Sequence, residues 1–189
     1  MRDTPRYPAP RRGVNSFAIS GFLRPFWVIP RMTTARHTSP ANTPSTAARI
    51  DVVLCVLLRS AQGCMQVLVA RRALDSEILP GAWELPGGKI APGESARDAG
   101  ARELLEEVAV DCTDAAHEWQ DLGVVEPPPP EGQPAPRFHV QAVQLPPGAV
   151  PRAIAARSIA WVSVKSLAHV EWPATTRPAI DVVIAAHGR

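Results

Sequence analysis

The sequence lacks the features that mark membrane-spanning and disulfide-rich proteins. No stretch approaches 18 uninterrupted apolar residues, and polar residues and a proline interrupt the best apolar run, residues 17–30, so no membrane span is expected. The three cysteines, Cys55, Cys64 and Cys112, are an odd number without C-x-x-C spacing, which argues against a disulfide scaffold and against a zinc site. We therefore expect a cytoplasmic protein, in which Cys55 is a small core residue.

Acidic residues are almost missing from the first part of the chain. Residues 1–50 hold eight arginines and a single acid, Asp3, whereas residues 51–189 hold twelve basic and seventeen acidic residues. The formal net charge of +2 is therefore the sum of a basic N-terminal segment and a mildly acidic remainder of the chain. This distribution excludes a reading of the whole chain as a basic nucleic-acid binder.

The basic start has the composition of a disordered tail. Residues 1–47 contain seven prolines, scattered arginines and a Ser/Thr/Pro-rich stretch at 38–46. Such a segment buries too little apolar surface to offset the entropy of ordering it. Met32 precedes the Ser/Thr/Pro-rich stretch, so a translation start at Met32 or later is a second hypothesis. We expect the folded domain to span residues 48–189, roughly 140 residues and long enough for a sizeable core.

The pattern of apolar residues in 48–189 predicts an α/β fold. Residues 79–93, rich in Gly and Pro, are expected to form loops and turns. An apolar stripe of Ala101, Leu104, Leu105 and Val108 predicts a helix over residues 94–108. β-Branched and alternating runs predict strands at 50–58, 65–70, 119–126, 137–145 and 159–164, and a last helix is expected near 178–187. Strands mixed with two helices favour an α/β sandwich with a mixed sheet.

Three carboxylates on the predicted helix point to a metal site. Glu103, Glu106 and Glu107 stand at positions i, i+3 and i+4 and share one helical face. Carboxylates gathered beside a glycine-rich loop repel each other unless a cation compensates them, and their hard oxygens suit Mg²⁺ or Mn²⁺. From spacing alone, a solvated acidic surface with i, i+4 pairs such as Asp98–Arg102 remains the alternative.

The segment from Gly88 to Val110 resembles the Nudix box, G-x₅-E-x₇-R-E-U-x-E-E-x-G-U, in which U is a bulky apolar residue. Every defining position matches except the last glycine, which is Ala109 here. The resemblance covers residues 49–189 and implies an α/β/α sandwich with a mixed β-sheet, in which the box forms a loop–helix–loop. The family glycine follows the helix, where φ > 0 is usual. Alanine there would cost ~1 kcal/mol if the backbone were kept, so we expect a slightly altered helix exit.

The resemblance also implies roles for the box residues. Glu103 and Glu107 are expected to bind the metal, Glu106 to bind it directly or through water, and the carbonyl of Gly87 to be a further ligand. Glu103 is also expected to act as general base or to orient the attacking water. Structural roles in holding the loop against the helix are implied for Glu94 and Arg102, and Gly88 and Gly93 are expected to allow turns that a β-carbon would hinder.

The sequence W-E-L-P-G-G-K at residues 83–89 looks like that of the MutT branch, the nucleoside triphosphate pyrophosphohydrolases. The resemblance implies substrate contacts for Arg72 and Lys89, and for Trp172 and Thr176 near the last helix. In MutT an Asn that reads 8-oxoguanine stands at the position of Thr176, and a hydroxyl cannot reproduce its two-sided hydrogen bonding. The expected reaction is Mg-dependent hydrolysis of an oxidised or ordinary dNTP or NTP to NMP and pyrophosphate, with the base left open.

Two other functions stay open at this point. ADP-ribose hydrolases of this family favour a proline about sixteen residues beyond the box, and Pro127 lies seventeen residues beyond Val110. This similarity keeps hydrolysis of ADP-ribose or another nucleotide sugar as the alternative. A non-catalytic nucleotide sensor is disfavoured because such domains often lose box carboxylates, and this box keeps all of them. In the MutT branch a metal-linked Glu stands a few residues before the position of Trp161. No acid occurs here between Glu131 and Glu171, so the resemblance implies fewer metals or ligation from the box alone. We expect a monomer or homodimer with a small-molecule nucleotide substrate and neither nucleic-acid nor membrane partners.

Overall fold

The structure is a computed structural model that describes residues 49–129 and 134–188. The predicted tail at residues 1–47 lies outside the described residues. Within those two ranges, no helix is both long and apolar enough to cross a bilayer. The elements are β1 (Arg49–Ala61), β2 (Cys64–Arg71), β3 (Trp83–Glu84), β4 (Gly87–Lys89), α1 (Ala96–Val108), β5 (Trp119–Val125), β6 (Ala135–Gln144), β7 (Ser158–Ser163), the 3₁₀-helix η1 (Val164–His169) and α2 (Arg177–His187).

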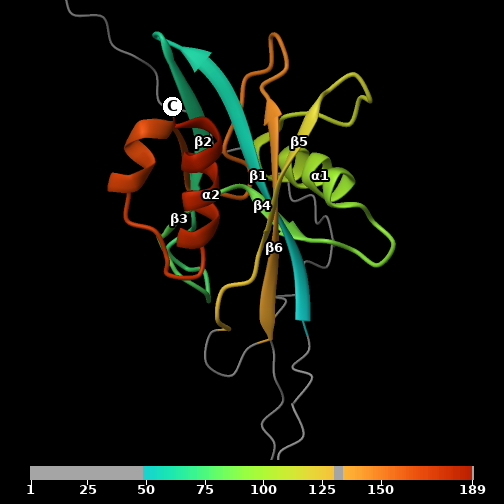
Figure 1. The fold of residues 1–189 in the computed structure, drawn as a ribbon, viewed down its shortest axis with the longest axis vertical. Coiled ribbons are helices and arrows are strands. Elements are labelled where there is room, and N and C mark those ends of the chain that lie inside the picture. Colours follow the sequence, from blue (N-terminus) through green and yellow to red (C-terminus); the bar gives the residue numbers. More distant parts are fainter. Residues whose placement is uncertain (1–48, 130–133, 189) are drawn as a thin grey trace, which may run out of the picture. The chain divides into compact units, whose positions relative to one another are not determined.

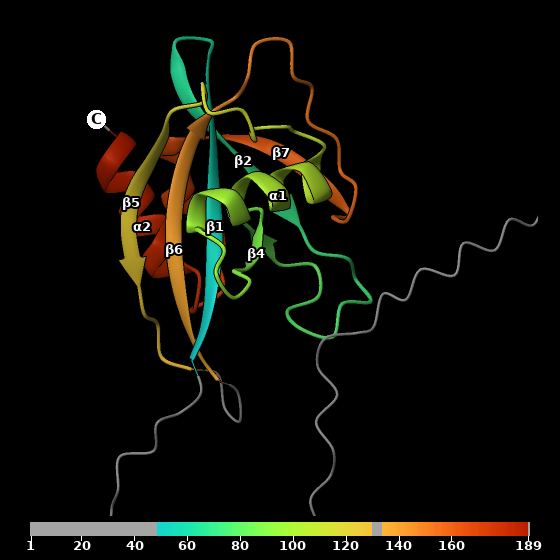
Figure 2. The same ribbon diagram turned by 90° about the vertical axis from the view of Figure 1, so that its right-hand side faces the viewer.

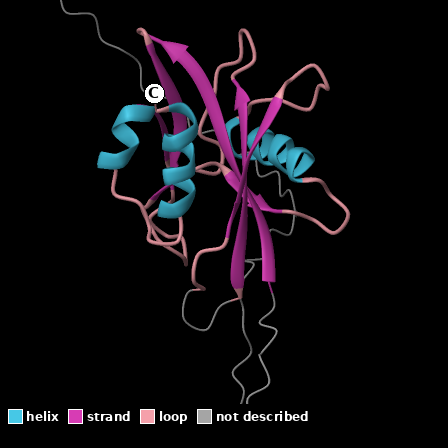
Figure 3. Cartoon of the chain, in the orientation of Figure 1, coloured by secondary structure: helices cyan, strands magenta, loops and turns pink. Residues whose placement is uncertain are grey.

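Strand β1 organises the sheet because it pairs with three other strands. It runs parallel to β6 along most of its length, and it is antiparallel to β4 near its start and to β2 near its end. Strand β2 pairs on its other side with β7, and β5 lies at the outer edge of β6. The mixed sheet predicted from the sequence is therefore confirmed (Figure 3).

Two helical layers cover the two faces of this sheet, with α1 on one side and η1 and α2 on the other (Figures 1 and 2). In β1, the side chains of residues 53, 55 and 57 pack with α1, and those of residues 54, 56 and 58 pack with η1 and α2. A strand buried on both faces needs an unbroken apolar run, which explains the sequence of β1. The α/β/α sandwich is confirmed, and Cys55 is fully buried in it as expected.

Helix α1 begins two residues later than predicted. Ser95 is its N-cap, and the Ser95 side chain accepts a hydrogen bond from the backbone N–H of Asp98. Glu94 therefore lies before the helix, on the loop. From this position the Glu94 carboxylate reaches Arg102 of α1.

The helix exit at Ala109 is not altered, so that expectation is wrong. Ala109 adopts the left-handed conformation, with φ 56° and ψ 37°. Its N–H donates to the carbonyl of Leu105 at 3.2 Å, and the N–H of Val110 donates to that of Leu104 at 3.1 Å. The bond from Ala109 to Leu105 is the 5→1 closure of the αL motif, a helix end that a glycine usually allows. The two bonds and the buried Val110 hold the turn in spite of the alanine.

The segment predicted as loop between residues 79 and 93 contains two short strands. Strand β4 pairs with residues 52–54 of β1, and β3 pairs with the end of β2. Two- and three-residue strands carry no periodicity of their own, so tertiary pairing alone defines them. The consequence for the site is that the glycines of β4 are fixed between the sheet and α1.

Candidate functional site

The guanidinium of Arg102 joins the loop, β4 and α1. It donates from Nε and Nη2 to the two oxygens of Glu94, at 2.9 and 3.1 Å, and from Nη2 to the carbonyl of Lys89 at 3.0 Å. Its Nη1 donates to Glu103 at 2.6 Å. The hydrogen bond from Arg102, together with that from the backbone N–H of Ala91, holds the pKa of Glu94 below its ordinary value. Through these bonds Arg102 connects Glu94 and Lys89 of the loop and β4 to α1.

Glycines make room for the acidic side chains. A Cβ on Gly88 would overlap the carboxylate of Glu103, so that carboxylate lies in the space which the missing side chain leaves. Gly93 takes φ 82°, a conformation that glycine adopts at little cost, and turns the chain into Glu94. The Glu103 side chain is only 12% exposed, and this burial raises its pKa.

Glu107 lies deeper, and Glu106 lies at the surface. The Glu107 carboxylate accepts a hydrogen bond from the N–H of Gly87 at 3.0 Å. Burial, and then the charges of Glu84 and Glu103, raise its pKa to about 7. Glu106 is 59% exposed, and its nearest cation is Nη1 of Arg102 at 3.5 Å. The three carboxylates therefore share a helical face as predicted but differ in environment.

The carboxylate oxygens of Glu103, Glu106 and Glu107 are hard ligands of the kind that a divalent cation prefers, but the three side chains do not converge on one point. Within residues 49–129 and 134–188, no three acidic, histidine or cysteine side chains converge closely enough to enclose an ion. The Glu103 carboxylate is bound by Arg102, and the Glu107 carboxylate by the N–H of Gly87. Two half-buried carboxylates on one helical face, both with raised pKa values, are nevertheless groups whose ionised form a Mg²⁺ or Mn²⁺ ion would stabilise.

A small pocket of about 180 Å³ opens beside Glu107, and Arg72 and Glu84 form part of its wall. Arg72 donates from Nη1 to Glu84 at 2.7 Å and from Nε to the carbonyl of Ile78 at 2.8 Å. Burial raises the pKa of Glu84 in spite of this pairing. The sequence interpretation did not single out Glu84. The sequence feature that could have indicated Glu84 is its position between Trp83 and Leu85, two residues that pack into the core.

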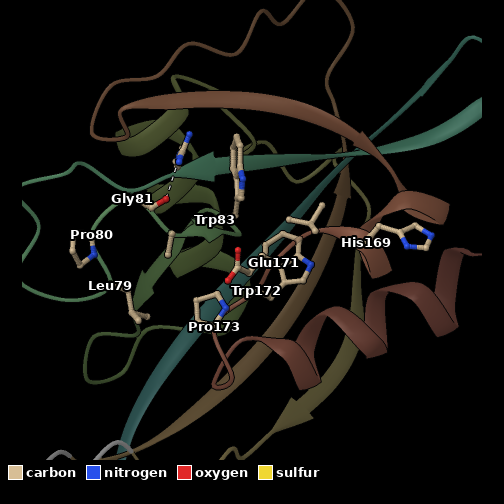
Figure 4. Close-up of a pocket in the computed structure, with 11 residues that line it drawn as sticks. Leu79, Pro80, Gly81, Trp83, His169, Glu171, Trp172 and Pro173 are labelled. Carbon is tan, nitrogen blue, oxygen red and sulfur yellow. Dashed lines mark hydrogen bonds between the residues drawn. The ribbon is translucent and has the colours of Figure 1, made fainter.

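A larger pocket of about 590 Å³ lies between the loop before β3 and the segment that leads to α2 (Figure 4). Trp83 and Trp172 line it, together with Arg71. The indole N–H of Trp172 donates to the carbonyl of Leu167 at 2.8 Å, which fixes that ring. Thr176 is buried at the N-terminus of α2 and does not line this pocket. Of the two residues expected to contact the base, only Trp172 therefore lines the larger pocket.

The chain matches proteins of known family in sequence and in fold. The family model for the NUDIX domain matches residues 48–183. A Mycobacterium tuberculosis protein named "Putative 8-oxo-dGTP diphosphatase 2" is 38% identical over 115 residues, which are 59% of this chain and 73% of that protein. The CTP pyrophosphohydrolase of Escherichia coli is 39% identical over 64 residues, 34% of this chain and 44% of that protein. The Bos taurus m7GpppN-mRNA hydrolase NUDT17 is 33% identical over 98 residues, 51% of this chain and 32% of that protein.

Solved structures agree. A MutT structure from a study of Aliivibrio salmonicida and Vibrio cholerae has a TM-score of 0.56 and 27% identity, and the match covers 74% of this chain and 99% of that one. The MutT protein of Methanosarcina mazei has a TM-score of 0.60 at 24% identity, over 75% and 96% of the two chains, which supports the fold. The chain therefore belongs to the NUDIX family, as a MutT-like hydrolase that acts on phosphoanhydride bonds.

Proposed function

We propose that this chain hydrolyses a nucleoside triphosphate, oxidised or ordinary, to NMP and pyrophosphate with Mg²⁺ or Mn²⁺. The observation that carries the proposal is the placement of the half-buried Glu103 carboxylate directly against Gly88 of β4, where it accepts a hydrogen bond from Arg102. The names of the relatives support a triphosphate or capped nucleotide as substrate. The larger pocket has the size of a small-molecule site and offers two tryptophans to a nucleobase.

The residues divide the task between binding and proton transfer. Glu103, Glu106, Glu107 and the carbonyl of Gly87 would hold the divalent cation, which when bound offsets phosphate charge and favours ionisation of water. Glu103 is the proposed acceptor of the proton from the attacking water, and burial raises its pKa toward the range where a carboxylate is an effective base. Arg72 and Lys89 would bind phosphate oxygens.

Base recognition is proposed for the larger pocket. Trp172 and Trp83 present aromatic surface there, and Trp172 is held in place by its bond to Leu167. Thr176 retains a hydroxyl that makes no helix-capping hydrogen bond, so it stays a candidate for a polar contact to a base. Its burial outside the pocket lining makes Trp172 the stronger of the two candidates.

A substrate panel tests the proposal. Purified protein with Mg²⁺ is offered 8-oxo-dGTP, the dNTPs and NTPs, ADP-ribose and NADH, and the products are separated by ion-exchange chromatography. We expect NMP and pyrophosphate from at least one triphosphate. Turnover of ADP-ribose alone, or release of NDP and phosphate, would contradict the triphosphate assignment.

A matched pair of variants tests the role of Glu103. Glu103→Gln is expected to lower kcat by at least ~10²-fold, the usual scale for a lost acid–base group, with the fold retained. Glu118→Gln removes an exposed acid at the start of β5 and serves as the control. Near wild-type turnover by Glu103→Gln would refute Glu103 as ligand or base.

A further inference from the structure

Two consecutive arginines at the end of β2 serve different pockets. Arg71 donates to the carbonyl of Gly81 at 3.0 Å and lies over the ring of Trp83 in the larger pocket. Arg72 lines the small pocket beside Glu107. Arg72 is therefore the arginine that shares a pocket with Glu107, and its orientation bears on what the Glu107 carboxylate can bind.

Two groups orient the Arg72 guanidinium. The carbonyl of Ile78 accepts from Nε at 2.8 Å, and the carboxylate of Glu84 accepts from Nη1 at 2.7 Å. Glu84 belongs to β3, whose backbone pairs with β2, so its carboxylate is anchored to the sheet. Both side chains are about 30% exposed, a degree of burial at which a short charge-assisted hydrogen bond is strong.

Glu107 is an alternative partner for the same guanidinium. It lines the same pocket of about 180 Å³, and the charges of Glu84 and Arg72 both act on it, the first raising and the second lowering its pKa. A guanidinium released by Glu84 would meet the half-buried Glu107 carboxylate across this pocket. Such a contact would occupy an anion that the proposed metal site needs and a cation that the proposed phosphate site needs.

We propose that Glu84 is a positioning residue that keeps Arg72 from pairing with Glu107, so that Arg72 faces substrate phosphate and Glu107 stays available to the divalent cation. This inference rests on the proposed function, because it takes Glu107 as a metal ligand. It assigns Glu84 a role outside the G-x₅-E-x₇-R-E-U-x-E-E-x-G-U pattern.

A double-mutant cycle tests the inference without substrate. Mn²⁺ is titrated into the full chain, and free Mn²⁺ is followed by electron paramagnetic resonance for wild type, Glu84→Gln, Arg72→Met and the double variant. We expect Glu84→Gln to weaken Mn²⁺ binding about tenfold, the factor that corresponds to ~1.4 kcal/mol. In the Arg72→Met background the same change should alter Kd by less than about twofold, because no arginine is released.

The alternatives give different results. If the Glu84 charge merely attracts Mn²⁺, Glu84→Gln weakens binding equally in both backgrounds, and the inference is overturned. The control Glu77→Gln removes an exposed acid from the same loop, and an equal loss with this variant also overturns it. Should Glu84→Gln fail to fold, Glu84→Asp replaces it in the cycle.

Substrate turnover separates this inference from the proposed function. Wild type that hydrolyses a triphosphate but shows no coupling between residues 72 and 84 overturns the positioning role alone. A coupled cycle in a protein that hydrolyses no triphosphate overturns the substrate assignment and supports the positioning role. Wild type that binds no Mn²⁺ overturns the positioning role, because Glu107 then holds no metal.

Discussion

The left-handed alanine after α1 offers a sharp test, because Ala109→Gly should stabilise the domain. The left-handed conformation costs a non-glycine residue about 1–2 kcal/mol. The greater conformational freedom of glycine in the unfolded chain reduces this gain in stability by about 0.5–1 kcal/mol. Ala109 is exposed, so its methyl group contributes little packing. The expected net gain in the free energy of unfolding is therefore ~0.5–1 kcal/mol, or a rise in Tm of about 2–4 °C for a domain of this size.

Urea unfolding and thermal unfolding of the purified protein measure this gain. Ala116→Gly is the matched control: it is exposed, lies between the same helix and β5, and is not among the residues with positive φ. It should lower stability by about 0.5–1 kcal/mol through unfolded-state entropy alone. A loss of stability in Ala109→Gly equal to that of the control would refute the argument that the helix exit is strained. Hydrolytic activity should be unchanged in both.

Three further predictions concern the site. Gly88→Ala should displace the Glu103 carboxylate and lower kcat by about 10²-fold, the scale for a misplaced reacting group, with little change in the circular dichroism spectrum. Arg102→Ala should lower the free energy of unfolding by about 2–3 kcal/mol in urea, because Glu94 and Glu103 lose their charge-assisted bonds; an effect as small as that of a surface arginine would contradict it. In EDTA, stability should fall as pH rises from about 4.5 through 7, by up to ~3 kcal/mol, because the raised pKa of Glu107 favours the protonated folded state. The loss should be smaller in Glu107→Gln and with Mg²⁺, and equal pH profiles for variant and wild type would argue against it.

Much of the fold could be predicted because its main elements carry local signals. The apolar run of β1 and the apolar stripe of α1 each report burial directly, and both elements lie where expected within a few residues. The strands β3 and β4 could not be predicted, because two- and three-residue strands exist only through pairing with β2 and β1. The first residue of α1 was misplaced because the capping bond of Ser95 outweighs the helix preference of Glu94.

Some features of the candidate site could likewise be predicted from the sequence, and others could not. Helical spacing predicted that Glu103, Glu106 and Glu107 share a face. The resemblance to the Nudix box implied structural roles for Glu94 and Arg102, and the two side chains form an ion pair in the structure. Spacing could not predict that Arg102 binds one of these acids and a backbone N–H binds another. Nor could it predict that Glu84, twenty-three residues before Glu107, stands in the same pocket.

The sequence by itself determined the family, the α/β class and the acids of the box, because each of these depends on residue identity at fixed spacing along the chain. Tertiary structure alone decided the environment of each acid. Glu103 lies directly against Gly88, Glu107 shares a pocket with Arg72 and Glu84 from another strand pair, and Glu106 stays at the surface. The physical reason is that desolvation and charge coupling depend on which distant segments pack together, and packing of distant segments leaves no mark in the local spacing of residues.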